Sequence, residues 1–252
     1  MPSVTAPDGT RIAYERAGSG PPLILIDAAG HFRANSPLDE LADLLTADFT
    51  VYRYDRRGRG DSTDTPPYAP AREVEDLAAL VDHAGPRVSL YGYSSGCLVA
   101  LHAAAAGLDV HRMALLEPPI DPAEDSTEQH AFIIKLRELT GEDAVSYFLT
   151  TIGVPPDMVD TMRGTPHWRA MVSVAHTLPY DGLLSAAVDA DLLARVTAPT
   201  LVLDSTGSTD DLTGMAATAA AMLPNAVHRS LAGEWHGVPA ATLAPVVASF
   251  LR

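Results

Sequence analysis

The stretch VSLYGYSSGCLVA, residues 88–100, predicts a strand, a tight turn and a helix in immediate succession. Its first residues are β-prone and apolar, and the small, apolar residues after Ser95 are typical of a buried helix. Gly92 and Gly96 flank the turn, where a larger side chain would collide with the neighbouring strand or helix. Ser94 lies at the apex in a strained backbone conformation, which is the pattern of a nucleophile elbow. The N–H of Ser95, at the start of the helix, then favours a developing negative charge.

Strand and helix patterns alternate on both sides of this stretch. Such alternation predicts a mostly parallel, twisted sheet with helices on both of its faces. The run Leu23–Asp27 is continuously apolar, as expected for a strand buried on both sides. The expected strands are 10–17, 23–27, 49–54, 88–91, 113–116, 200–204 and 226–231, and the expected helices are 38–45, 72–84, 95–106, 187–195, 212–223 and 238–251.

The alternation is interrupted between residues 121 and 185. This segment is mostly helical in pattern, most clearly at 132–139 and 144–151, and contains no strand candidate. We therefore expect one α/β core domain formed by residues 1–120 and 186–252, with 121–185 inserted as a helical lid. Ligands of open α/β sheets bind at the carboxyl ends of the strands, where such a lid would lie.

A histidine late in the chain is the best candidate for a general base. A serine nucleophile needs a base within hydrogen-bonding reach. His236 follows Gly233-Glu234-Trp235 on the loop between the last strand and the last helix, from which it can fold back over Ser94. His31 lies in another loop near the expected site and is a candidate for substrate contact.

The composition argues against several classes of function. The 252 residues include 17 Lys and Arg against 32 Asp and Glu, giving a formal net charge of −15, which disfavours nucleic acid and anionic membranes as partners. The single cysteine, Cys97, allows no intrachain disulfide, and without a metal-binding motif we expect no metal and no other cofactor. No signal peptide or membrane span is visible, so we expect a cytoplasmic monomer or homodimer that binds a small-molecule substrate.

These motifs resemble the α/β-hydrolase superfamily over nearly the whole chain. Besides the elbow and His236, the stretch DRRGRGDS at 55–62 resembles the superfamily's glycine-rich loop after the fourth strand. The resemblance implies the α/β-hydrolase fold and acyl transfer: His236 takes the proton of Ser94, which attacks a carbonyl carbon, and water later releases the acyl group.

The resemblance also implies an oxyanion hole made by two backbone N–H groups. One belongs to Ser95, and the other comes from the loop after the predicted strand 23–27, where many relatives have His-Gly and this chain has DAAGH, residues 27–31. By position the second donor is Ala29, with Ala28 next. The carboxylate of Asp27 would oppose an oxyanion nearby, so we expect it to be held by backbone N–H groups or by an arginine such as Arg57.

The acid that would orient His236 has more than one candidate. Glu117 lies at the end of the predicted strand 113–116, which corresponds to the superfamily's sixth strand, beside two prolines, and some superfamily members place their acid there. Most relatives place it after the superfamily's seventh strand, here the predicted strand 200–204, where the expected position is Ser208, followed by Asp210 and Asp211. Asp204, at the end of that strand, is a further candidate, and we favour Glu117 over Asp210.

The leading hypothesis is a serine hydrolase that cleaves an ester, lactone or thioester of small or medium size. A lyase, cyclase or acyltransferase with the same Ser94 and His236 is an alternative, as is a non-catalytic protein that binds a small molecule on this fold. We expect Ala28, His31 and Tyr93 to line the substrate pocket. Apolar lid residues would complete it, chiefly Trp168, with Phe132, Leu136, Phe148, Met158, Met162, Met171 and Tyr180.

Overall fold

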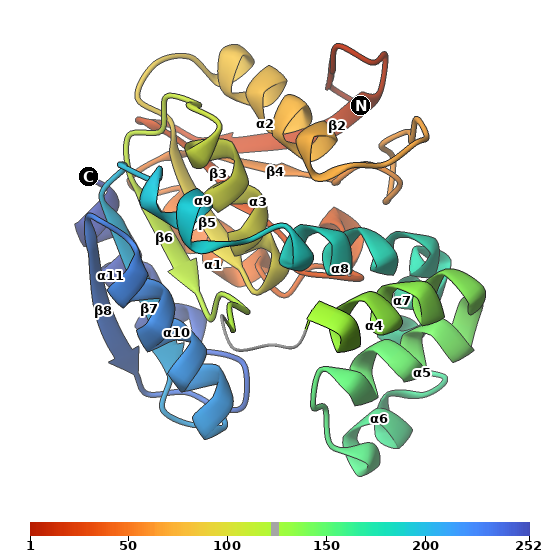
Figure 1. The fold of residues 1–252 in the computed structure, drawn as a ribbon. Helices are drawn as coiled ribbons and strands as arrows, with labels where there is room; N and C mark the ends of the chain where they lie inside the picture. Colours follow the sequence, from red (N-terminus) through yellow and green to blue (C-terminus); the bar gives the residue numbers. More distant parts are fainter. Residues whose placement is uncertain (122–125) are drawn as a thin grey trace.

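The computed structural model describes residues 1–121 and 126–252. Within them, eight strands form one sheet in the order β1-β2-β4-β3-β5-β6-β7-β8 (Figure 1). The first two strands pair antiparallel, β2 also pairs antiparallel with β4, and all other neighbours are parallel. The strands are β1 Ser3–Thr5, β2 Arg11–Gly18, β3 Pro22–Ile26, β4 Thr50–Tyr54, β5 Ser89–Tyr93, β6 Met113–Leu116, β7 Thr200–Ser205 and β8 Ala226–Leu231.

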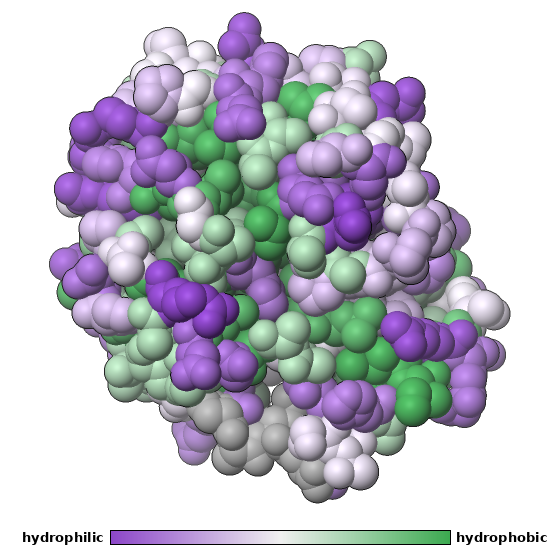
Figure 2. Space-filling view, turned by 45° about the horizontal axis from the view of Figure 1, so that its top comes forward, coloured by the Kyte–Doolittle hydropathy of each residue, from purple (hydrophilic) through white to green (hydrophobic). Residues whose placement is uncertain are grey.

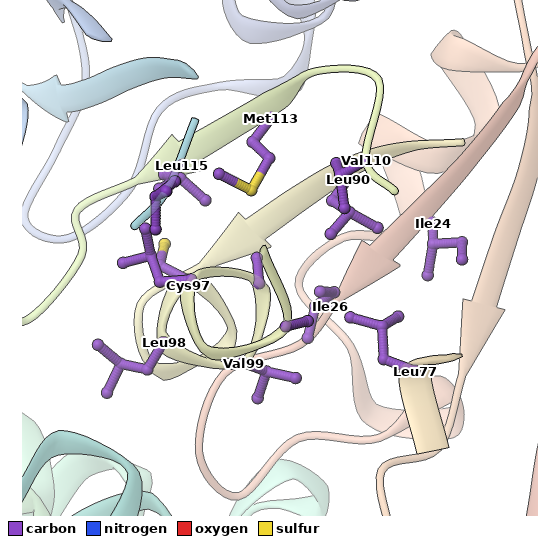
Figure 3. Packing of buried hydrophobic residues seen from close by; sticks show 14 of the residues in the cluster. Ile24, Ile26, Leu77, Leu90, Cys97, Leu98, Val99, Val110, Met113 and Leu115 are labelled. Atoms are coloured by element: carbon purple, nitrogen blue, oxygen red, sulfur yellow. The ribbon is translucent and has the colours of Figure 1, made fainter. Parts of the chain in front are cut away.

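Helices cover both faces of the sheet, as predicted. Within the described residues the core helices are α1 Asp39–Leu45, α2 Pro70–Ala84, α3 Ser95–Ala105, α9 Ala190–Ala194, α10 Asp210–Met222 and α11 Ala240–Leu251. Ile24 and Ile26 of β3 join an apolar cluster with α2, α3, α9 and α10, part of which Figure 3 shows. Leu23 and Leu25 point the other way, into a cluster with α1 and α11. The apolar run in β3 is therefore buried on both sides, because successive strand residues face opposite layers.

The described residues between β6 and α9 are mostly helical, and we call α4 to α8 the helical insertion. These helices are α4 Ser126–Glu138, α5 Gly141–Thr151, α6 Pro156–Met162, α7 Pro166–Ser173 and α8 Leu178–Ala186. Figure 1 shows α4 to α7 grouped beside the sheet, while α8 leads back to the core. An apolar cluster inside the insertion also includes Ala29 and is contacted by Trp235, both from the core. Of the predicted lid, 121–185, residues 122–125 lie outside the described part of the chain.

Polar and apolar residues are mixed on the face of the molecule drawn in Figure 2. Figure 2 shows hydrophilic side chains surrounding smaller hydrophobic patches on one face. Among the described residues, no helix is both long enough and apolar enough to cross a membrane.

Candidate active site

Ser94 lies on the turn between β5 and α3 with φ 50° and ψ −122°, a conformation that L-residues rarely adopt. The glycines on either side make this turn possible. A Cβ on Gly92 would lie 2.7 Å from Cα of Cys97, and one on Gly96 would lie 2.2 Å from the carbonyl oxygen of Ile26. Backbone atoms are the obstacle in both places, so only glycine fits without a shift of the chain.

His236 contacts Glu117 through its ring and the core through its backbone. Its Nδ1 lies 2.5 Å from Oε2 of Glu117. Its carbonyl oxygen accepts a hydrogen bond from the hydroxyl of Tyr93 at 2.7 Å, and its N–H donates to Oγ of Ser208 at 2.9 Å. With Nδ1 held in this way, the other ring nitrogen, Nε2, is left for chemistry.

Glu117 directly follows β6 and is fully buried. Its Oε1 accepts hydrogen bonds from the N–H of Ser205 at 2.8 Å and from Oγ of Ser208 at 2.6 Å. Burial opposes ionisation of Glu117, but the hydrogen bonds from His236, Ser208 and Ser205 outweigh it, so the pKa of Glu117 lies below its ordinary value. The carboxylate beside His236 is therefore ionised at neutral pH.

Backbone strain marks these residues. Among the described residues, the non-glycine residues with positive φ are Arg87, Ser94, Glu117 and His236. Three of these four meet at one site. Strain of this kind persists where the surrounding structure enforces it, and it concentrates at functional sites.

The other candidate acids lie elsewhere. Asp210 and Asp211 begin α10 and are exposed at the edge of the cavity described below. Asp204 is buried, and its Oδ2 lies 2.5 Å from Nε2 of His228. In the described part of the chain, the carboxylate hydrogen-bonded to the His236 ring is that of Glu117.

Ser208 is a member of the site that sequence reasoning missed. Its place in the sequence corresponds to that of the acid in most relatives, but a hydroxyl cannot act as the acid, and no sequence motif indicates its structural role. In the structure its hydroxyl donates to Glu117 and accepts from the N–H of His236. It thereby connects the two residues and fixes their relative position.

The loop after β3 lies against the elbow. Ala28, Ala29 and Ser95 are almost fully buried, and all three line the same cavity as Ser94. Arg59 restrains this loop through two hydrogen bonds: its Nη1 donates to the carbonyl oxygen of Ala28 at 2.7 Å and to that of His31 at 3.3 Å.

Asp27 is held differently from the expectation. Its Oδ1 accepts a hydrogen bond from Oγ of Ser36 at 2.8 Å. Arg57, the arginine suggested for it, instead pairs with Asp76 and Asp8, both with contacts between 2.7 and 3.0 Å. Burial raises the pKa of Asp27 to about 6, with the Ser36 hydrogen bond opposing the shift. Asp27 therefore carries less charge in slightly acidic solution than an ordinary aspartate.

His31 faces the cavity as a neutral imidazole. Its Nδ1 lies 2.8 Å from the carbonyl oxygen of Ala29, and its ring lies 5.2 Å from the ring of His167, which also lines the cavity. Burial, and then the neighbouring His167, lower the pKa of His31 to about 3. Neither a net charge nor general-base strength is available from His31 at neutral pH.

A cavity of about 1040 Å³ lies between the core and the helical insertion. Ser94 and His236 line it, as do the predicted pocket residues Ala28, His31 and Tyr93. Trp168 does not: its side chain is fully buried within the insertion, where the guanidinium of Arg163 lies 5.1 Å from its ring centroid. The tryptophan on the cavity wall is Trp235 of the core.

The cavity wall is apolar with an acidic component. Its apolar residues include Leu98, Phe132, Phe148, Leu149, Met158, Met162, Met171 and Met215. Among the described lining residues the charged ones are Asp121, Glu128, Asp181, Asp210 and Asp211, with no Lys or Arg. Asp181 is neutralised by Arg56 and Arg59, while the exposed carboxylates of Asp210 and Asp211 make their edge of the cavity acidic.

Fold and site together define a class of hydrolytic enzymes built on a mostly parallel sheet with a serine on the turn after its fifth strand. The family model of the alpha/beta hydrolase family matches residues 11–248. The chain therefore belongs to the alpha/beta hydrolase family, and it is a hydrolase.

Individual relatives agree with this assignment. The chain is similar to an alpha/beta hydrolase from Sphaerobacter thermophilus DSM 20745, with 42% identity, full coverage of both chains and a TM-score of 0.87. It is similar to a hydrolase from Pseudomonas aeruginosa PA01, with 25% identity over 99% of this chain and 97% of that one and a TM-score of 0.82. It is also 28% identical to a non-heme haloperoxidase of Rhodococcus erythropolis over 94% of this chain and 93% of the relative.

Proposed function

We propose that this hydrolase cleaves carboxylic esters, including lactones and thioesters, through a catalytic triad of Ser94, His236 and Glu117. The observation that carries the proposal is the 2.5 Å contact between Oε2 of Glu117 and Nδ1 of His236, on the wall of the cavity that contains Ser94. An ionised carboxylate at Nδ1 keeps the proton there and leaves Nε2 as the base.

The reaction begins when Nε2 of His236 accepts the proton of the Ser94 hydroxyl as its oxygen attacks the carbonyl carbon. Glu117 stabilises the imidazolium that forms, and its own proton count does not change. His236 then gives the proton to the leaving alcohol or thiol, and an acyl-enzyme on Ser94 remains. A water molecule, activated by His236 in the same way, releases the acid.

The oxyanion of each tetrahedral intermediate is bound by the N–H groups of Ser95 and Ala29. Ser95 is the first residue of α3, so the positive end of the helix dipole adds to its hydrogen bond. Ala29 belongs to the loop that Arg59 restrains by its hydrogen bond to the carbonyl oxygen of Ala28. Preorganised donors of this kind supply a large part of the rate enhancement in acyl transfer.

The cavity favours an apolar substrate that is neutral or cationic. Its aromatic and methionine side chains suit an acyl or alcohol group of small to medium size. The acidic edge formed by Asp210 and Asp211 would repel a substrate carboxylate and attract a cation.

Hydrolysis of p-nitrophenyl acetate and butyrate tests this proposal. We expect wild-type turnover, and a loss of at least about 10³-fold in kcat for Ser94→Ala and for His236→Ala. Ser173→Ala, which changes an exposed serine of α7, is the matched control and retains wild-type kcat. Equal turnover by Ser94→Ala and wild type would refute the proposed mechanism.

A further inference from the structure

One carboxylate of the helical insertion is connected to both sides of the proposed oxyanion hole, directly to Ser95 and through Arg59 to the loop of Ala29. We propose that Asp181, on α8, is a positioning residue that holds the N–H groups of Ser95 and Ala29 in place relative to each other. This inference rests on the proposed function, because it concerns the same oxyanion hole. It makes the insertion part of the catalytic apparatus in addition to its place in the cavity wall.

The first contact is direct. Oδ1 of Asp181 accepts a hydrogen bond from Oγ of Ser95 at 2.8 Å and another from Nη1 of Arg56 at 2.7 Å. Asp181 and Ser95 are 4% and 5% exposed, so water does not compete effectively for these bonds. Since the side chain and the N–H of Ser95 belong to one residue, the bond to Asp181 restrains the direction of that N–H.

The second contact runs through Arg59. Oδ2 of Asp181 accepts from Nη2 of Arg59 at 2.7 Å, and Nη1 of the same guanidinium donates to the carbonyl oxygen of Ala28 at 2.7 Å. That carbonyl and the N–H of Ala29 belong to one planar peptide group and point in opposite directions. Arg59 therefore orients the Ala29 N–H by holding the carbonyl on the other side of the same peptide.

Buried charges at this place are not explained by stability alone. Arg56, Arg59, Asp181 and Glu73 are each at most 4% exposed, and Arg56 also makes two hydrogen bonds to Glu73, at 2.6 and 2.7 Å. Burying such pairs costs desolvation, and an apolar replacement is often as stable. Nε of Arg59 is buried without a hydrogen-bond partner among the described residues, a further cost. These hydrogen-bonded charges do, however, fix the relative positions of Ser95 and the loop of Ala29, which form the proposed oxyanion hole.

The charge of Asp181 is matched to this role. Burial opposes its ionisation, but Arg56 and Arg59 outweigh burial, so the pKa of Asp181 lies below its ordinary value. An ionised Asp181 can accept from both arginines and from Ser95 together. Because two guanidinium groups face it, its negative charge does not oppose the oxyanion as an unpaired carboxylate would.

Steady-state kinetics of Asp181→Asn and Ser95→Ala test the inference, with a neutral p-nitrophenyl ester as substrate. Misaligned oxyanion donors weaken binding of the transition state more than binding of the ester, so we expect kcat to fall about 10- to 100-fold while KM stays within about twofold. Binding of a phenylboronic acid, which forms a tetrahedral adduct on the serine, should weaken by a similar factor. The double variant should lose less than the product of the two single losses, because both substitutions disturb the same hydrogen-bonded unit of Ser95, Asp181 and Arg59.

Asp76→Asn is the matched control. Asp76 is an equally buried carboxylate that pairs with Arg57 of the same loop, and it has no hydrogen bond to Ser95, Arg59 or residues 28–31. We expect it to lower the unfolding midpoint while kcat stays within about twofold of wild type. Assays are run well below each variant's midpoint, and Ser95→Ala, which removes one hydroxyl, carries the test if Asp181→Asn does not fold.

Wild-type kcat in folded Ser95→Ala and Asp181→Asn would overturn the inference, as would a loss confined to KM, which would make Asp181 a substrate contact instead. Failure of the proposed function looks different: the wild-type protein itself would hydrolyse no ester and bind no boronic acid.

Discussion

Oε2 of Glu117 lies 2.5 Å from Nδ1 of His236, although 119 residues separate them in the chain. Glu117 directly follows β6, His236 lies on the loop after β8, and both have positive φ. The hydroxyl of Ser208 joins them by donating to one and accepting from the other. The fold thus brings three distant loops together to hold one imidazole ring.

Replacing Glu117 with Gln should lower kcat about 10²- to 10⁴-fold, because the amide no longer keeps His236 in the tautomer that leaves Nε2 free. Steady-state kinetics on a neutral ester provide the measurement. Asp210→Asn and Asp204→Asn are the matched controls, since these carboxylates do not contact His236, and both should stay within a few-fold of wild type. A larger loss in Asp210→Asn than in Glu117→Gln would move the acid to α10.

Asp27→Asn should make the protein more stable in neutral and alkaline solution. Burial raises the pKa of Asp27 to about 6, against an ordinary value of 3.8, so the folded state binds a proton that the unfolded state releases. The folded state is favoured by this group below about pH 4 and loses that contribution as pH rises through about 6. At pH 8 the buried charge of Asp27 therefore lowers the free energy of unfolding by about 3 kcal/mol, a cost that a neutral Asn does not have.

Urea unfolding of wild type and Asp27→Asn at pH 5 and pH 8 measures this difference. The stability gained by the substitution should be larger at pH 8. A gain that is the same at both pH values, or larger at pH 5, would show that Asp27 is not the group responsible.

Gly96→Ala should destabilise the protein by about 2–4 kcal/mol, because the added methyl meets the carbonyl of Ile26 and the chain must shift. Gly214→Ala is the contrasting change. Gly214 lies in α10 with open space around it, so alanine should stabilise by about 0.5–1 kcal/mol. Denaturant unfolding of both variants checks the pair. Equal effects would mean that the close approach of the elbow helix to β3 is not a constraint.

Substrate charge should affect the rate strongly. With three esters of similar length bearing a methyl, a carboxylate or a trimethylammonium group, we expect the carboxylate ester to have the lowest kcat/KM, about 10-fold or more below the methyl ester at low salt. The gap should narrow as salt increases and in Asp210→Asn/Asp211→Asn, since screening and charge removal weaken the same repulsion. Comparable rates for all three esters would exclude an electrostatic role for this edge of the cavity.

Local sequence patterns were sufficient to predict most of the fold and the two central residues of the site, Ser94 and His236. The strand, turn and helix around Ser94 are encoded in one short stretch, and the apolar run of β3 is equally local, so both were predictable. The three-residue edge strand β1 was missed because so short a segment has no periodicity to detect. The helix expected at 187–195 proved shorter, as α9 occupies only Ala190–Ala194.

The remainder of the site depends on contacts between distant segments. The sequence could not decide whether Glu117 or Asp210 is the acid that orients His236, because this depends on which loop lies beside the His236 ring in the folded protein. Ser208 contacts Glu117, and Asp181 contacts Ser95, each from a distant segment of the chain, and no sequence motif indicates either contact. Trp168 is a large aromatic residue of the kind that lines pockets, but its side chain packs inside the insertion. The orientation of α7 decides which of its faces meets the cavity, and sequence does not determine that orientation.

Covalent labelling tests most directly whether Ser94 is a nucleophile activated by His236. The folded protein is treated with a fluorophosphonate, digested and mapped by mass spectrometry. We predict one adduct on the peptide that contains Ser94, none in Ser94→Ala, and much slower labelling in His236→Ala. An adduct on a different residue, or no adduct on folded wild-type protein, would contradict the account.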